Sequence, residues 1–174
     1  IAVAGIPYRI PPDAELPERL NAVATTVYLL FTAGVAGGDE PVRPQLCDEA
    51  IRLGRLPVAL MPDESSLQGL LALMLPTDAR RETRADDAGS LELIADQDRT
   101  RCDAARIAEG ATLVEAALRR SRHRAGRFEL EAAIAACHAT ATTYGETDWG
   151  DIIALYDALL RLSPTHVVRL NRAV

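Results

Sequence analysis

The side chains best suited to chemistry in this sequence are its three histidines, a residue type that binds metals and transfers protons near neutral pH. His123, His138 and His166 lie at no spacing typical of metal ligands. Only His138 lies within a strong helical run, EAAIAACHA at 131–139. We interpret it as a histidine of the core or of a groove rather than as a catalytic base.

Two acidic stretches are the next candidates. Asp86 and Asp87 stand beside Gly89 in a polar turn, where carboxylates commonly meet solvent or bond to the local backbone, and we prefer that interpretation to a metal site. The run from Asp96 to Arg99 combines two acids, an amide and a guanidinium at the start of a helix. A helix cap with an ion pair is the simpler explanation for this run.

No catalytic constellation emerges from the remaining residues. The glycine-rich stretch at 34–40 does not precede a phosphate-binding lysine, and the chain contains no lysine at all. It also lacks a nucleophile elbow and an HExxH pattern. Its three cysteines are widely separated and lack the close pairing of a zinc or redox motif. We therefore interpret them as small buried hydrophobic residues. We therefore predict no catalytic residue, no metal and no cofactor, although residues scattered over several helices can still form an enzyme site.

The composition is that of a folded domain. Of its 174 residues, 48% are hydrophobic and 25% are charged, which excludes a disordered acidic tail. The net charge is −6, and the one dense basic run, Arg119 to Arg124, falls at an expected helix end, where cations complement the helix dipole. We therefore expect no direct DNA binding by this chain. No apolar run approaches the roughly 20 residues of a membrane span, so we expect no membrane contact and a cytoplasmic location.

Apolar residues recur at helical spacing along most of the chain. The pattern from Leu16 to Phe31 predicts a helix over 16–34, which the following glycines end. Pro76 removes a backbone donor and clashes with the preceding turn, so the third helix is expected to kink or end there. Asp98 and Asp148 are expected to cap later helices. The other predicted helices lie near residues 46–54, 67–76, 98–121, 128–141, 148–162 and beyond 164.

One stretch departs from the helical pattern. Residues 82–98 contain turn formers followed by the short alternating run LELI, which predicts a small β-hairpin or an ordered loop. The predicted fold class is therefore all-α, an antiparallel array of about seven helices with at most one small β-hairpin. We expect a single domain over 1–174, with a helical layer at 1–81, the hairpin or loop at 82–97 and repeat-like helices at 98–174.

The last of these regions contains a helix, a proline and a second amphipathic helix in close succession. Residues 151–174 resemble the second helix of a tetratricopeptide repeat followed by the first helix of the next, although an ordinary bundle turn explains the pattern nearly as well. Each helix pair of such an array exposes an apolar face that a neighbouring pair covers. Because the sequence stops within such a unit, we expect it to be a fragment of a longer protein.

Several separated motifs together carry a family resemblance. They are IPYRIP at 6–11, LCDEAIRLGR at 46–55, GLLALMLPTDARR at 69–81, DQDRTRCD at 96–103, EAAIAACHA at 131–139 and TDWGDIIALYDALLRLSPTHVVRLNRAV at 147–174. The chain resembles, over essentially its whole length, the tetratricopeptide-like carboxy-terminal extension of extracytoplasmic-function RNA polymerase sigma factors. It departs from their usual pattern at three positions, with Pro76 for leucine, Cys102 for tryptophan and Glu131 for glutamine.

The resemblance implies a regulatory protein-interaction domain in bacterial transcription initiation. It also implies that core RNA polymerase and promoter DNA are bound by separate sigma domains, which this sequence lacks. The expected partners are those sigma domains of the same full-length protein and a possible separate regulatory protein. The alternative is a small-molecule-binding or enzymatic helical domain. An open helical groove favours the first hypothesis, and a deep enclosed pocket with His138 beside converging carboxylates favours the second.

The candidate interaction residues are the polar members of the matching motifs. Their alternative role is in internal ion pairs and helix caps, for which arginine is equally well suited. They are Tyr8, Arg9, Glu49, Arg52, Arg55, Asp78, Arg80, Arg81, Asp96, Gln97, Asp98, Arg99, His138, Asp148, Trp149, Asn171 and Arg172.

Overall fold

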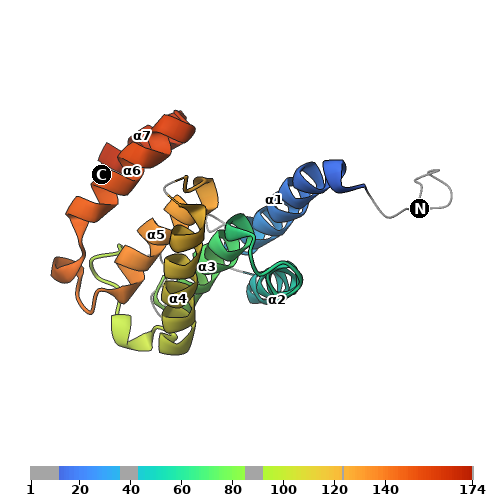
Figure 1. Cartoon of the computed structure of the whole chain (residues 1–174). Coiled ribbons are helices and arrows are strands. Elements are labelled where there is room, and N and C mark those ends of the chain that lie inside the picture. Colours follow the sequence, from blue (N-terminus) through green and yellow to red (C-terminus); the bar gives the residue numbers. More distant parts are fainter. Residues whose placement is uncertain (1–11, 36–42, 85–91, 123, 174) are drawn as a thin grey trace.

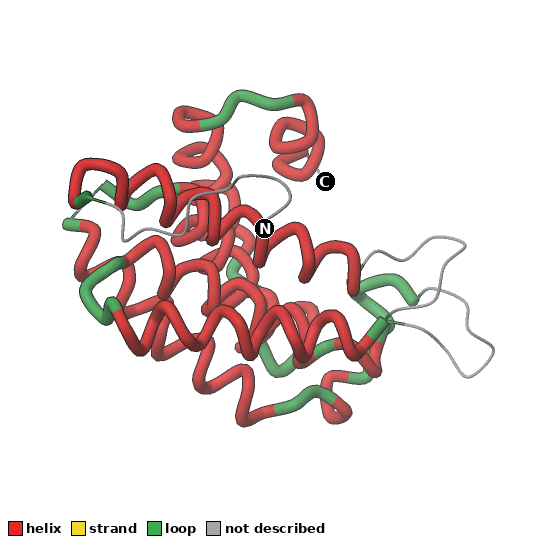
Figure 2. The backbone as a smooth tube through the Cα atoms, turned by 90° about the vertical axis from the view of Figure 1, so that its right-hand side faces the viewer, coloured by secondary structure: helices red, strands yellow, loops and turns green. Residues whose placement is uncertain are grey.

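The computed structural model describes residues 12–35, 43–84, 92–122 and 124–173, and this part of the chain is helical without a strand (Figures 1 and 2). The prediction of an all-α fold with about seven helices is confirmed. The α-helices are α1 (Leu16–Val35), α2 (Pro44–Leu60), α3 (Ser65–Ala79), α4 (Ala104–Ser121), α5 (Arg127–Thr140), α6 (Trp149–Leu162) and α7 (His166–Ala173). Short 3-10 helices lie at Asp13–Glu15, Arg81–Thr83, Arg99–Arg101 and Tyr144–Glu146.

Helix α3 is the centre of the molecule. It packs against α2, α4 and α5, with α1 and α2 on one side and α4 and α5 on the other (Figure 1). Its sequence is apolar on every face, as expected of a helix buried all round. Leu67, Leu70 and Met74 face the cluster formed with α1 and α2, and Ala72 belongs to a second cluster with α4 and α5. A third apolar cluster joins α5 to α6 and α7.

Two glycines allow α3 to approach its neighbours closely. A Cβ atom at Gly69 would lie 2.8 Å from the backbone nitrogen of Glu129 at the start of α5. One at Gly110 of α4 would lie 2.8 Å from Cδ of Pro76. Both positions are therefore closed to larger side chains unless the helices separate.

Pro76 lies inside α3. We expected the helix to kink or end there, and it does not end, because α3 continues to Ala79. The ring leaves the carbonyl of Ala72 without its usual helical donor. Gly110 brings α4 directly against this turn, and its Cβ position is 3.5 Å from that carbonyl oxygen. Tertiary packing thus holds a turn that local sequence rules disfavour.

The two predicted capping aspartates have different outcomes. Asp148 caps α6 as predicted, since its side chain accepts the backbone N–H of Asp151 at 2.9 Å. Asp98 instead caps the 3-10 helix Arg99–Arg101, and the cap of α4 is Asp103. The expectation that α4 begins at Asp98 is therefore wrong. The chain makes one tight turn after Asp98 before the helix starts, and a second aspartate is available five residues later.

The predicted hairpin region is only partly described, because residues 85–91 lie outside the described residues. Its described ends are the 3-10 helix Arg81–Thr83 and a turn after Glu92, and neither contains a strand. The backbone N–H of Glu92 bonds to the carbonyl of Arg84 at 2.9 Å. The two ends of this stretch are therefore held together as a loop.

A buried ion cluster ties α2, α3 and α4 together. The side chain of Asp78 is 1% exposed and pairs with Arg81 at 2.6 Å and also with Arg106. Both arginines reach Asp48 of α2, at 2.8 and 3.4 Å. This arrangement supplies a buried carboxylate with two cations, and it fixes Arg81 in an internal role.

Replacing Gly69 tests the close contact between α3 and α5. We expect Gly69→Val to lower the free energy of unfolding by at least about 2 kcal/mol, because its Cβ would collide with the backbone of Glu129. The measurement is urea denaturation followed by circular dichroism. Gly145→Val is the matched control, since no atom lies within 4 Å of its Cβ position, and it should change stability by under about 0.5 kcal/mol. Equal losses in the two variants would contradict the close packing.

Replacing Asp78 tests the buried ion cluster. We expect Asp78→Asn to cost roughly 3 kcal/mol in urea denaturation, because it leaves Arg81 and Arg106 without the buried carboxylate. Glu49→Gln removes a carboxylate from an exposed pair with Arg52 and should cost no more than about 1 kcal/mol. A small loss at Asp78 would mean that the cluster does not hold the three helices together.

Candidate functional groove

The principal hollow of interest is a groove of about 930 Å³ that lies between α1 and the α6–α7 pair. Its floor consists of residues from α3 and α5. Figure 1 shows α1 and the α6–α7 pair on opposite sides of these two helices. We call it the α1–α7 groove. Its apolar lining comes from Phe31, Val35, Leu73, Ile134, Tyr156, Leu159, Val167 and Val168.

One face of α5 runs along this groove. Arg127, Glu131, Ile134 and His138 follow helical spacing and all line it. Because an α-helix rises 1.5 Å per residue, these side chains span roughly 16 Å. The groove is therefore long enough for several turns of a helix or a short extended segment.

The end of the groove near the start of α5 contains an ion pair between Arg127 and Glu131. Arg127 donates to Glu131 at 2.8 Å and to the hydroxyl of Tyr28 at 3.4 Å, and its guanidinium lies 5.1 Å from the centre of the Tyr28 ring. Burial, followed by the charge of Glu131, raises the pKa of Tyr28. Glu131 and Arg127 thus neutralise each other, and the described residues that line this end of the groove include no other charged side chain.

The other end holds two arginines. Arg80 donates to the side-chain oxygen of Gln97 at 2.8 Å, and Arg84 donates to the carbonyl of Thr77 at 3.2 Å. No carboxylate in the described part of the chain forms an ion pair with either one. Burial lowers the pKa of both arginines, and the nearby charges of Arg84 and Arg99 lower that of Arg80 further. Among the described residues, this end of the groove therefore carries two positive charges without an acidic partner.

His138 lies at the same end of the groove. Its pKa is lowered to about 4, first by burial and then by the charges of Arg80 and Arg99. Its ring meets Trp149 edge-on, with centroids 5.4 Å apart, and Arg99 donates to the carbonyls of His138 and Ala141, both at 2.7 Å. His138 is consequently neutral at pH 7 and adds no third positive charge to the groove.

The side chains that line the groove are suited to binding an anionic ligand. Of the described His, Cys, Asp and Glu side chains, no group of three or more is placed to hold a metal ion. The carboxylate that lines the groove is bonded to Arg127, so it is not poised beside His138 as a catalytic pair. Arg80, Arg84 and the neutral His138 lie beside apolar walls. This combination suits a ligand in which an anionic group is attached to an apolar one.

The predicted interaction residues fall into separate places. Arg80, His138 and Asn171 line the groove, and Gln97, Arg99 and Trp149 support it from behind. Others make ion pairs elsewhere: Asp78 and Arg81 in the buried cluster, Glu49 with Arg52, Arg55 with Glu109, and Arg172 with Asp157. Asp98 and Asp148 are caps, Asp96 donates its backbone N–H to Leu93, and Tyr8 and Arg9 lie outside the described residues.

The sequence analysis did not predict three charged residues of the groove, or the tyrosine that one of them contacts. They are Tyr28, Arg84, Arg127 and Glu131. The spacing of Arg127, Glu131 and His138 along α5 was the available signal for two of them. Arg84 carries no such pattern, because it follows the helix after a 3-10 turn.

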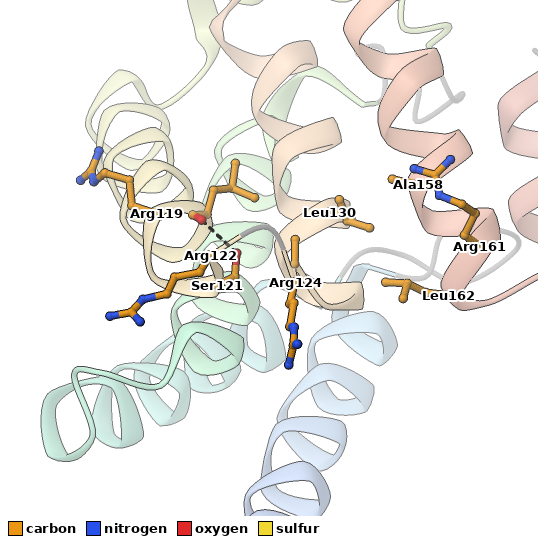
Figure 3. A pocket seen from close by; sticks show the side chains of 10 residues that line it. Arg119, Ser121, Arg122, Arg124, Leu130, Ala158, Arg161 and Leu162 are labelled. Carbon is orange, nitrogen blue, oxygen red and sulfur yellow. Dashed lines mark hydrogen bonds between the residues drawn. The ribbon is translucent and has the colours of Figure 1, made fainter.

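A second hollow, of about 940 Å³, lies at the C-terminal ends of α4 and α6. Four arginines line it: Arg119, Arg122, Arg124 and Arg161. Figure 3 shows that their guanidinium groups point in different directions rather than toward one point. This favours the interpretation of the Arg119–Arg124 run as a solvated helix end, and we take the α1–α7 groove as the candidate site.

Comparison with known proteins places the chain in a family. A model described as a family of unknown function, DUF6596, matches residues 19–118. The chain belongs to this family. The matched region includes most of α1 and α4 and all of α2 and α3, so the DUF6596 match covers Arg80 and Arg84 but not α5 to α7.

One relative extends beyond the DUF6596 region. The chain is 45% identical over 176 residues to the uncharacterized protein R00370 of Rhizobium meliloti (strain 1021). The match covers 100% of this chain and 41% of that protein, so the chain spans less than half the length of its relative. No solved structure matches the chain. Among the described helices, none combines the length and apolarity needed to cross a bilayer.

The lowered pKa of His138 predicts a pH dependence of stability. The unfolded chain binds a proton below the ordinary value of 6.5, whereas the folded chain resists it until about 4. Stability is therefore complete above 6.5 and falls as the pH drops toward 4. After allowance for solvent screening, we expect wild type to lose roughly 1–2 kcal/mol more than His138→Gln between pH 7 and pH 5 in urea denaturation.

His166→Gln is the matched control for this measurement. His166 is exposed on α7, so its replacement should leave the pH dependence of wild type unchanged. If His138→Gln loses as much stability as wild type over the same range, His138 is not held neutral in the fold.

Proposed function

We propose that this chain is a regulatory protein-interaction domain of a bacterial RNA polymerase sigma factor, and that the α1–α7 groove binds a protein segment. The observation that carries the interaction role is the groove itself, with apolar walls from separate helices and positive charge at one end. Grooves of this kind bind amphipathic segments through apolar anchors, while the charges select among partners.

The link to transcription initiation rests on the resemblance of the sequence motifs to sigma-factor extensions. The proposal assigns promoter and core-polymerase binding to other domains of a longer protein located in the cytoplasm. The length of the relative supports this division, because the chain aligns in full with only 41% of it. The preferred occupant of the groove is a segment of the sigma domains in the same full-length protein.

A small-molecule-binding or enzymatic domain is the second candidate. The size of the groove favours it, because about 930 Å³ lies within the range of small-ligand sites. His138 also lines the groove and is neutral, as a general base must be. Against an enzyme, Glu131 is bonded to Arg127. We therefore place the protein-interaction function first.

Photo-crosslinking of the full-length protein tests the proposal. A photoreactive benzoylphenylalanine at Val167, a 66% exposed residue of the groove wall, should crosslink to a segment outside this domain. The same residue at Leu60, 82% exposed and absent from the groove lining, is the matched control and should give no such product. Mass spectrometry of the crosslinked peptides identifies the segment.

Binding to core RNA polymerase tests the link to transcription. The full-length protein mixed with purified core enzyme should co-elute with it in gel filtration. Failure to co-elute would contradict the sigma-factor assignment. Crosslinks from Val167 that match those from Leu60 would contradict the groove as the docking site.

A further inference from the structure

A feature of the α1–α7 groove points to the chemistry of its occupant: two arginines at one end have no acidic partner among the described residues. Arg80 is the C-terminal capping residue of α3, and Arg84 follows the 3-10 helix Arg81–Thr83. Both line the groove. Each is held by one neutral acceptor, the side-chain oxygen of Gln97 or the carbonyl of Thr77.

Arg81, the residue next to Arg80, has acidic partners where Arg80 has a neutral one. Arg81 turns toward Asp78 and Asp48, at 2.6 and 2.8 Å, so its charge is neutralised inside the fold. Arg80 turns to Gln97, a neutral amide, and its charge is not neutralised there. Within the described residues, Arg81 therefore has two carboxylate partners, and Arg80, which lines the groove, has none.

Electrostatics favours an anion at this place. Two half-buried cations repel one another and lose hydration, and a bound carboxylate offsets both costs. A guanidinium has five N–H donors, and the structure gives one hydrogen bond to Arg80 and one to Arg84 within the described residues. Donors thus remain for the forked contact that arginine makes with a carboxylate.

The apolar lining of the groove favours a ligand that joins a carboxylate to an apolar group. Phe31 and Val35 of α1 and Val167 and Val168 of α7 line the same groove, so an occupant reaching the arginines also meets apolar side chains. A nucleic-acid backbone fits this lining poorly, and the net charge of −6 opposes its approach. A protein segment with an acidic residue among apolar ones satisfies both features.

We propose that Arg80 and Arg84 form a carboxylate-binding site that recognises an acidic side chain of the segment docked in the α1–α7 groove. This inference rests on the proposed function, because it names the chemistry of the groove's occupant. The ligand class is a carboxylate joined to an apolar group.

The test follows the side-chain Nε–H signals of Arg80 and Arg84 in nitrogen-15 NMR spectra of the whole 174-residue chain. The probe is 4-phenylbutyrate, which joins a carboxylate to an apolar ring, at constant ionic strength. Both signals should shift and saturate, while the signal of Arg119, outside the groove, should not move. The neutral 4-phenylbutanamide should leave all three signals unchanged.

Two sets of variants assign the effect to the arginine pair. Arg80→Gln with Arg84→Gln should weaken binding of 4-phenylbutyrate at least about tenfold, since hydrogen bonds to charged groups are lost. Arg119→Gln with Arg161→Gln removes the same charge elsewhere and should change affinity less than about twofold. If the first pair unfolds, Arg84→Lys keeps the charge but removes the fork, and it should still weaken binding several-fold.

Three outcomes would overturn the inference. The amide could bind as well as the acid, the control pair could lose as much affinity as the site pair, or inorganic phosphate could shift the two signals as strongly as 4-phenylbutyrate, which would indicate a site for free anions. These outcomes are distinct from failure of the proposed function. That failure shows in crosslinking and core-enzyme binding, and it leaves the NMR result unaffected.

Discussion

The burial of α3 on all sides is the constraint on which the rest of this structure depends. A helix that is apolar all round must be covered by neighbours, and α2, α4 and α5 cover this one. Close coverage requires small residues at the crossings, and Gly69 and Gly110 provide them. Burial also requires that polar groups near the helix ends find partners. Gln68 donates to the carbonyl of Pro62 at 2.7 Å, and Asp78 binds Arg81 and Arg106.

The C-terminal end of α3 creates the charged end of the groove. The last carbonyls of a helix carry partial negative charge, which favours cations such as Arg80 at this position. The chain then makes a 3-10 turn, and Arg84 bonds back to Thr77 in the last full turn of α3. Since α5 packs along α3, His138 lies close to Arg80 and is held neutral by burial and by that charge. One helix end therefore supplies both the position and the electrostatics of the candidate site.

Local rules predicted the helices well where local interactions decide the structure. The apolar spacing from Leu16 predicted a helix over 16–34, and α1 ends at Val35, while Asp148 caps α6 as its position suggested. They failed where a distant segment decides. The helix does not end at Pro76, and the close approach of Gly110 of α4 to the proline ring is a tertiary contact that local rules do not include. The cap of α4 was misplaced because two aspartates, at 98 and 103, both suit a helix start.

The candidate site was harder to predict than the fold, for a physical reason. Arg80 and Arg81 are adjacent, and helical spacing favours Arg81 as the partner of Asp78, because these two residues are three positions apart. The sequence does not show that Arg106 and Asp48 complete the cluster, or that Arg80 lines a groove, because these features depend on how α2, α4 and α5 pack around α3.

Neighbouring arginines therefore have different roles, because Arg81 belongs to the buried cluster and Arg80 lines the groove. The buried cluster around Asp78 stabilises the fold, whereas Arg80 and Arg84 carry like charges that no carboxylate of the described residues neutralises. An anion that binds only the folded chain therefore stabilises the whole domain by mass action. Binding of such an anion at Arg80 and Arg84 would therefore be coupled to the stability of α3, because both arginines follow its C-terminal end.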